Sequence, residues 1–560
     1  MSVVVWPVLT RLAFWAMMLG VVALMACTGS VQEPTGGDTP GPAAQPGQPK
    51  RGGTLVIPED ASKPSNDTDA HRGTASTNLN VSGNIHLPII GEDTQNRGKI
   101  IGYLADSWEV SPDGKTYTIK VKELTTHKGK PFNAEDVAYN LNRFRTRPNK
   151  LPLARAGCVY ELMDNAKAVD RTTVVITLQD RAPSFLACLG NPHIMIQPKY
   201  LLEEIDGPGK GRPVQPEEVD GVGPFKLVKW VDGAIIEMER FDSYYRQGLP
   251  YLDKLHSVQL PDPASVIAAF RTQRIQIFRK YATTPNKEEV DTLKAELGDR
   301  ISTKAVVAPG ATGFQLHSKR QPLDDIRVRE AIDLAYNRQA YRDLINSGEG
   351  LLSGPYYCGW GWVFTCQELE TWPGHRAQKT EDLKRANQLM QEAGYGPQTP
   401  LKLTVSCGTA SPDSCDILRE DLKKIGIDLA INRQEENVRR KQIEDQAFDI
   451  HAWIRIIPAG DPDDYHGLHY MPNAGENRAK WENPRYVELF KEQRRELDRE
   501  KRAKILREMG KILYDDHVLL HGYGPMLHQT WWSFVKGYEP PGESLPHQTH
   551  YIADHIWLDQ

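Results

Sequence analysis

The chain has no excess of basic residues, which excludes the usual signature of a nucleic-acid-binding protein. It carries 68 Lys and Arg against 73 Asp and Glu, a formal net charge of −5 at pH 7. Proteins that bind nucleic acid neutralise phosphates with clustered cations, and that surplus is missing. With 39% hydrophobic and 25% charged residues over 560 positions, the composition is typical of a globular protein of several domains.

Signatures of common enzymes are missing as well. The sequence contains no HExxH, GxSxG or Walker A motif, and "GPGKGR" (207–212) lacks the spacing and the Ser or Thr of a phosphate-binding loop. The segment "GVGPF" is not continued into a GxGxxG dinucleotide pattern. We therefore expect no cofactor and a function other than catalysis.

The long apolar run of the chain stands near its N-terminus. Residues 12–26, "LAFWAMMLGVVALMA", follow Arg11. A run of about fifteen residues is short of the roughly 20 that cross a membrane, so residues 1–26 are predicted to be a secretory signal peptide. An uncleaved anchor is the alternative, if the apolar residues before Arg11 are counted.

The apolar run ends in "LMAC" (24–27), which resembles the bacterial lipobox, although Met25 departs from the small or β-branched residue usual there. The resemblance implies that Cys27 is lipidated and holds an exported protein on a membrane, at its periplasmic or extracellular face. Residues 27–50 are rich in Pro and Gly and are predicted to be a flexible tether.

Cysteine spacing agrees with export, because disulfides form in oxidising compartments. Zinc is the alternative, but the sequence has no CxxC knuckle. The spacing suggests three disulfides, which are Cys158–Cys188, Cys358–Cys366 and Cys407–Cys415.

Hydrophobic periodicity predicts α/β architecture with an antiparallel subdomain. Residues 104–144 predict a β-hairpin around "SPDGK" and then a helix with Asn133 as its N-cap. Residues 221–245 predict two strands around an Asp-Gly turn. Residues 322–345 predict one helix capped near Asp324, and residues 486–516 one long amphipathic helical stretch with Leu497 on its apolar face.

Several segments together resemble a known family. They are "LADSWEVSPDGKTYTIKVKE" with "HKGKPFNAEDVAYNLNRF" (104–144), "GVGPFKLVKWVDG" (221–233), "PLDDIRVREAIDLAYNR" (322–338) and "FDIHAWIRIIPAGDPDDYH" (448–466). In this order the chain, from about Arg51 onward, is similar to the bacterial extracellular solute-binding proteins of family 5. These are the oligopeptide-, dipeptide- and nickel-binding components of ABC importers.

The resemblance implies a periplasmic-binding-protein type 2-like fold, with two α/β lobes, a hinge and an extra subdomain inserted in the first lobe. The implied boundaries are residues 51–85, 195–305 and 528–560 for lobe I, 86–194 for the inserted subdomain and 306–527 for lobe II. It also implies a monomer that captures a peptide-like or other small organic solute between its lobes. The partners would be a membrane permease and its ATPases, or a receptor if the protein is a solute sensor.

The stretch "PAGDPDDYHGLHY" (458–470) is where specificity is expected. Peptide-binding members of the family commonly place an aspartate about three residues after a tryptophan equivalent to Trp453, where it pairs with the α-amino group of the peptide. Ile456 stands there, so either Asp461, the next aspartate, takes its place or the anchor for a peptide amine is absent. We expect ligand contacts from four residues of this region, which are Trp453, Arg455, Asp461 and Asp464.

Aromatic residues in "GPYYCGWGWVF" (354–364) resemble a cleft-facing loop of the family, so Tyr356, Trp360 and Trp362 are further candidate ligand-binding residues, with core packing as the alternative. A different class of function stays open from composition alone. A secreted metal-dependent hydrolase would use the acids and histidines of one stretch, which are Asp461, Asp463, Asp464, His466 and His469. We expect a solute-binding loop there, with no metal.

Overall fold

The computed structural model describes residues 47–560 apart from short internal segments. Those outside the description are 61–67, 73–75, 94, 97–98, 147–156, 192, 207–210, 261, 279–284, 308–309, 346, 357, 359–362, 409–411, 457–460 and 541–551. Residues Pro49–Gln560 form one compact unit. The predicted signal peptide and Cys27 lie outside the described residues, and no helix within them is long and apolar enough to span a bilayer.

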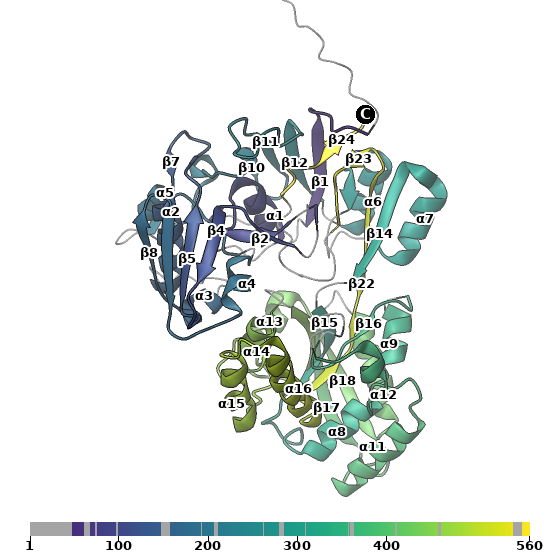
Figure 1. Ribbon diagram of the computed structural model, residues 1–560. Helices are drawn as coiled ribbons and strands as arrows, with labels where there is room; N and C mark the ends of the chain where they lie inside the picture. Colours follow the sequence, from purple (N-terminus) through teal and green to yellow (C-terminus); the bar gives the residue numbers. More distant parts are fainter. Residues whose placement is uncertain are drawn as a thin grey trace, which may run out of the picture. The chain divides into compact units, whose positions relative to one another are not determined.

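The first sheet of this unit is mixed, with the order β1-β12-β11-β10 (Figure 1). Its strands are β1 (Thr54–Asp60), β10 (Phe225–Val231), β11 (Ile235–Arg240) and β12 (Lys254–Leu260). The predicted turn between β10 and β11 is confirmed, and Gly233 adopts a φ of +73° that favours glycine. Helical elements of this region are α1 (Ser76–Ile85), α5 (Lys199–Asp206), η2 (Pro216–Glu218), α6 (Pro263–Arg271), α7 (Lys287–Leu297) and η3 (Gly298–Arg300).

The predicted antiparallel subdomain is built on a sheet of order β4-β5-β9-β8. Its elements are β2 (Ile90–Glu92), β3 (Ile100–Gly102), β4 (Ala105–Val110), β5 (Thr116–Val121), β6 (Leu124–Thr125), β7 (Pro131–Phe132), α2 (Ala134–Thr146), α3 (Gly157–Leu162), β8 (Met163–Asp170), β9 (Thr173–Leu178) and α4 (Phe185–Leu189). The predicted hairpin and helix are confirmed. Asn133 Oδ1 accepts a hydrogen bond from the Glu135 N–H at 2.9 Å, which caps α2.

The larger sheet has the order β18-β17-β19-β15-β20. Its strands are β15 (Gly310–Leu316), β17 (Leu401–Gly408), β18 (Ile427–Gln434), β19 (Ile450–Ile456) and β20 (Leu519–His521). Helices of this region are α8 (Ile326–Ala335), α9 (Arg338–Ile345), α10 (Cys366–Glu370), α11 (Thr380–Glu392), α12 (Pro412–Lys423), α13 (Glu436–Glu444), α14 (Pro462–His469), α15 (Pro484–Gln493) and α16 (Arg499–Asp515).

Two chain crossings connect the first and the larger sheet. The chain passes from β14 (Ile301–Val307) into β15 and returns from β20 into β22 (Met526–Trp532), and β14 pairs antiparallel with β22. Minor strands complete the fold, and they are β13 (Ile277–Phe278), β16 (Leu351–Leu352), β21 (Tyr523–Gly524), β23 (Val535–Lys536) and β24 (Trp557–Leu558).

Two segments predicted to form continuous helices are each broken into two helices, so these predictions are wrong. The segment 322–345 forms α8 and α9 with a break at Tyr336, and α8 is capped by Asp325. The stretch 486–516 forms parts of α15 and α16, because Asp498 caps a new helix there. Leu497 lies in the break with 52% of its surface exposed, so it is no part of an apolar face.

Buried apolar side chains of the described residues gather in three clusters. One runs from Val307 to Tyr523, one from Leu87 to Ile196 with three later residues, and one combines Leu55–Ile301 with Trp532–Leu558. The three predicted disulfides are confirmed, namely Cys158–Cys188, Cys358–Cys366 and Cys407–Cys415, with Cα–Cα distances of 6.0, 5.0 and 6.7 Å.

Candidate functional site

Parallel strands end at one edge of each mixed sheet. β1 and β12 run in parallel register up to the pair Asp60 and Leu260. In the larger sheet β17 is parallel to both β18 and β19. Ligands of open α/β sheets bind beyond the carboxyl ends of parallel strands, so these two edges are the candidate site.

Trp453 and Arg455 lie close to the carboxyl end of β19. The Trp453 ring meets the His469 ring edge-on at a centroid distance of 5.1 Å. Within the described part of the chain, the buried Trp453 Nε1 has no hydrogen-bond partner. Trp453 therefore presents an unused donor near the strand end. Arg455 pairs with Ala311 in the strand register, and its side chain lies outside the described residues, so its ligand role stays a prediction.

Asp461 begins α14 and is paired with an arginine. Its carboxylate accepts from the Asp463 N–H at 2.8 Å as the N-cap and from two nitrogens of Arg502, at 2.9 and 2.5 Å. Both side chains are buried, and such a bidentate pair fixes the start of α14 against α16. The ligand roles of Asp461 and of Asp464, whose side chain is outside the description, stay predictions.

Asp463 joins α14 to the antiparallel subdomain. Its buried carboxylate accepts from Ser184 Oγ at 3.1 Å, from Gln493 Nε2 at 2.8 Å and from Arg494 Nε at 2.8 Å. Arg494 also donates to Glu161 on α3 at 3.0 Å. We call these five residues the Asp463 contact, and it links α14 and the end of α15 to α3 and the start of α4.

The histidines of the same stretch are held by aromatic neighbours. His466 Nδ1 hydrogen-bonds the Tyr486 hydroxyl, and His469 packs against Trp453. A hydrolase would need these histidines to converge with Asp461 and Asp463 on one metal. Instead, both acids bind arginines, and among the described residues no three His, Cys, Asp or Glu side chains could hold a metal ion together.

Tyr356 is buried against α16. Its hydroxyl donates to the Leu506 carbonyl at 2.8 Å, and only 1% of its surface is exposed. A Cβ on Gly510 would come within 2.6 Å of its ring, so the two pack closely. These are the contacts of core packing, the alternative stated above. Trp360 and Trp362 lie outside the described residues, and the binding roles of all three aromatics stay predictions.

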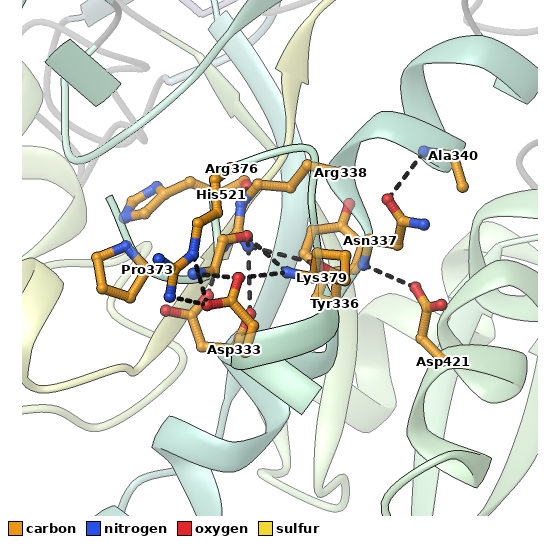
Figure 2. Close-up of polar contacts among 12 residues, drawn as sticks. Asp333, Tyr336, Asn337, Arg338, Ala340, Pro373, Arg376, Lys379, Asp421 and His521 are labelled. Atoms are coloured by element: carbon orange, nitrogen blue, oxygen red, sulfur yellow. Dashed lines mark hydrogen bonds and ion pairs between the residues drawn. The ribbon is translucent and has the colours of Figure 1, made fainter. Parts of the chain in front are cut away.

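A buried charged cluster fills the break between α8 and α9 (Figure 2). Arg338 has 1% of its surface exposed and pairs with Asp333. It also donates to the carbonyls of His521, at 2.6 Å, and Gly374, at 2.5 Å. Asn337 continues the cluster, because its backbone N–H donates to Asp421 at 2.7 Å.

Electrostatics in this Arg338 cluster favour an ionised Asp333. Burial raises the pKa of Asp333, but the charges of Arg338 and the hydrogen bond from His517 outweigh it and hold the pKa well below its ordinary value. Burial and the nearby Arg338 charge lower the pKa of Lys379 to about 8. Lys379 donates to the Gly374 carbonyl at 2.9 Å, so the cluster ties a loop and two helices together.

The Arg338 cluster also positions one chain crossing between the sheets. The His521 carbonyl that Arg338 binds ends β20, from which the chain runs into β22. A Cβ on the next residue, Gly522, would meet the Thr312 carbonyl oxygen at 2.6 Å, so only glycine fits against β15 there. This cluster therefore fixes the strand that leaves the larger sheet.

Sequence reasoning missed the arginines that organise this region, namely Arg338, Arg494 and Arg502. Each lies in a helix or helix end rich in charge, where a solvent-exposed face is the ordinary expectation. Arg338 and Arg502 are instead 1% and 3% exposed. A signal did exist at Arg338, because the segment "AYNRQAY" places polar residues inside an otherwise apolar helical pattern.

Comparison with known families assigns the chain to one of them. The family model described as "Bacterial extracellular solute-binding proteins, family 5 Middle" matches residues 99–477. The chain belongs to this family. Its members are periplasmic or extracellular binding proteins, which confirms the family expected from the sequence motifs.

Individual relatives are similar in sequence to this chain over most of its length. A "Di/tripeptide-binding protein 2" of Pseudomonas aeruginosa is 27% identical over 78% of this chain and 84% of its own length. The "Dipeptide-binding protein" of Escherichia coli is 25% identical over 74% of this chain and 79% of its own length.

Solved structures share the fold of this family member. A periplasmic binding protein DppA from Helicobacter pylori, in complex with the peptide STSA, superposes with a TM-score of 0.76 at 22% identity, over 91% of this chain and 99% of its own. Haemophilus influenzae OppA, in complex with RPPGFSPFR, gives 0.75 at 19% identity, over 92% and 100%. The predicted α/β fold of the type 2 periplasmic binding proteins is confirmed.

Proposed function

We propose that this family 5 protein is the substrate-binding component of an ABC importer, which captures a peptide-like solute and delivers it to a membrane permease with its ATPases. The observation that carries the proposal is similarity along most of the chain to proteins named for di- and tripeptide binding. The solute would lie beyond the carboxyl ends of β1, β12, β17, β18 and β19, where ligands of such sheets bind. Binding without chemistry fits a site in which Asp461 and Asp463 are paired with arginines.

The proposed domain organisation has three parts. Lobe I comprises residues 51–85, 195–305 and 528–560, the inserted subdomain 86–194 and lobe II 306–527. The three hydrophobic clusters support this division, because each draws its residues almost entirely from one part. The β14–β15 and β20–β22 crossings would then be the hinge, about which solute binding shifts an open-to-closed equilibrium.

Solute contacts are proposed for the residues singled out by the family motifs, which are Tyr356, Trp360, Trp362, Trp453, Arg455, Asp461 and Asp464. Trp453 has the best support, because its unused indole N–H lies near the end of β19. Asp461 has less support as an anchor for a peptide amine, because Arg502 already binds both of its oxygens.

Peptide binding can be tested directly. Native mass spectrometry of the purified protein would identify a co-purifying solute, and calorimetry with Ala-Ala-Ala and N-acetyl-Ala-Ala-Ala would measure affinity. We expect binding of the unmodified peptide, and similar binding of the acetylated peptide if Asp461 is reserved for Arg502. Binding of neither peptide, with no co-purifying peptide, would contradict the proposal.

Membrane attachment is proposed at Cys27, with residues 1–26 removed as a signal peptide and 27–50 as the tether. The "LMAC" motif supports it. The full chain expressed in a bacterium should appear in the membrane fraction, and Cys27→Ser should release it into the soluble exported fraction. A Cys27→Ser protein that stays with the membrane would favour an uncleaved anchor.

A further inference from the structure

Three polar side chains share one face of the first sheet near its carboxyl edge. In the register, Ser257 of β12 pairs with Ile236 of β11, and Ile236 pairs with Trp230 of β10. Gln259 is two residues beyond Ser257, and alternate residues of a strand point to the same face. Figure 1 shows the strands side by side. We call Trp230, Ser257 and Gln259 the β12 polar group.

Ser257 and Gln259 of the β12 polar group are buried, and Trp230 is half-buried with its Nε1 atom covered. Ser257 is 0% exposed and Gln259 7% exposed. No residue that the structure describes bonds to Ser257 Oγ, to either amide atom of Gln259 or to Trp230 Nε1. Leaving a buried polar group without a hydrogen-bond partner is unfavourable, so four such atoms on one face call for a bound partner.

The position of Gln259 relates this group to the candidate site. It is the last residue but one of β12, at the edge where solutes of such sheets bind. A Cβ on Gly233 would lie 4.0 Å from Gln259 Oε1, so the carboxamide lies beside the β10–β11 turn. The residues of that turn are exposed, and Trp230 lies on its β10 side.

We propose that the β12 polar group is a subsite for an uncharged hydrogen-bonding group of the solute, such as a peptide amide. This inference rests on the proposed function and names a lobe I contact for it. The group offers donors from Trp230 and Gln259 and an acceptor from Gln259, the complement of one amide N–H and one C=O. It contains no charged side chain, so it favours neutral groups over a carboxylate or an ammonium.

The chain contains a matched control for Gln259. Gln276 is also buried, at 9% exposure, but its carboxamide is satisfied. Gln276 Oε1 accepts from the Val56 N–H at 2.6 Å, and Gln276 Nε2 donates to the Gln273 carbonyl at 2.6 Å. Both substitutions make the same chemical change. Gln259→Leu makes it where the carboxamide has no protein partner, and Gln276→Leu makes it where the carboxamide is hydrogen-bonded.

The first measurement is thermal stability without solute. We expect Gln259→Leu to melt at or above the temperature of the parent, because no protein hydrogen bond is lost, and Gln276→Leu to melt clearly lower. If Gln259→Leu melts as low as Gln276→Leu, its carboxamide has a partner such as a structural water, and the subsite is overturned.

The second measurement is affinity for Ala-Ala-Ala by calorimetry. We expect Gln259→Leu to weaken binding about tenfold or more and Gln276→Leu to leave it unchanged. Trp230→Phe keeps the ring but removes the donor, and it should weaken binding as well. Unchanged affinity in both Gln259→Leu and Trp230→Phe would overturn the subsite while the proposed function stands.

A parent protein that binds no peptide would instead contradict the proposed function. The subsite is then decided by native mass spectrometry of the co-purifying solute. An uncharged solute kept by the parent and by Gln276→Leu, but lost from Gln259→Leu, supports it. Equal retention by all three proteins counts against it.

Discussion

Buried charged side chains in this protein are compensated by direct partners. Arg143 is 1% exposed at its side chain and pairs with both Asp69 and Asp206, at 2.7 and 2.6 Å. Arg338 is equally buried and pairs with Asp333. Removing one partner of a buried pair leaves an uncompensated charge, which costs more than the pair itself contributes.

Arg338→Met should therefore destabilise the protein strongly, by about 3–5 kcal/mol, because Asp333 loses its main counter-charge. Urea unfolding followed by tryptophan fluorescence would measure the loss. Arg327→Met is the control, since Arg327 forms an exposed pair with Asp325 and such pairs contribute about 0–1 kcal/mol. Equal losses in the two variants would show that burial of the pair does not matter.

His451 makes stability depend on pH. Burial, with the charges of Arg439 and Arg478, lowers its pKa from 6.5 to about 3, against the effect of its bond to the Ala452 carbonyl. The folded protein keeps His451 neutral, whereas the unfolded chain takes up a proton near pH 6.5. Stability from this group is thus full above pH 6.5 and falls as the pH drops toward the folded pKa.

We expect the free energy of unfolding of the parent to fall by about 1.4 kcal/mol per pH unit more than that of His451→Gln between pH 6 and 4. Glutamine can still donate to Gln315, the side-chain partner of His451 at 3.3 Å. Denaturant curves at three pH values would give the two slopes. Parallel slopes would mean that His451 is already protonated in the folded protein.

At the scale of elements, the Asp461 carboxylate stabilises the start of α14 in two ways. Asp461 caps the helix and neutralises Arg502. Asp461→Asn keeps the cap but leaves Arg502 without its counter-charge, so we expect a loss of about 3 kcal/mol or more in the solute-free protein. Asp461→Ala should lose roughly a further 1 kcal/mol.

Asp498→Asn is the control, because Asp498 caps α16 at an exposed position and asparagine caps equally well. It should change the melting temperature little. If Asp461→Asn kept the parent's stability and lost only peptide affinity, Asp461 would be a solute anchor and the structural role would be refuted.

Local sequence signals predicted those elements whose conformation depends on neighbouring residues in the chain. The Asp-Gly turn before β11 and the Asn133 cap were readable because each needs a particular residue type. The break at Tyr336 was not readable, because tertiary contacts of Arg338 produce it. The break at Leu497 had a local signal, the N-cap Asp498, which the apolar periodicity obscured.

The location of the candidate site and its solute contacts both stay predictions. Motif order located β19 and α14, and the strand-end rule agrees with that location. Which side chains are free to bind depends on pairings across distant segments, such as Asp461 with Arg502. The β12 polar group gave no signal, because a Gln or Ser in an alternating strand is normally a surface residue.

At the scale of the whole molecule, the Asp463 contact spans the inserted subdomain and lobe II as proposed above. Arg495 adds a second ion pair between the same regions, with Asp180 at 2.6 Å. Breaking bonds between two separately packed parts affects their association more than the folding of either. The triple variant Glu161→Gln, Asp180→Asn and Ser184→Ala removes the subdomain side and leaves the bonds of Asp463 to Gln493 and Arg494 in place.

We expect this triple variant to bind Ala-Ala-Ala about tenfold more weakly with an almost unchanged melting temperature, because the lost contacts stabilise the closed state that holds the solute. Calorimetry measures the affinity, and small-angle X-ray scattering should give a larger radius of gyration with peptide present. Added salt should weaken the parent more than the variant. Glu239→Gln is the control, since it breaks an exposed pair with Lys226 inside the first sheet. If the triple variant and Glu239→Gln both bind peptide with the affinity of the parent, the Asp463 contact has no part in closure.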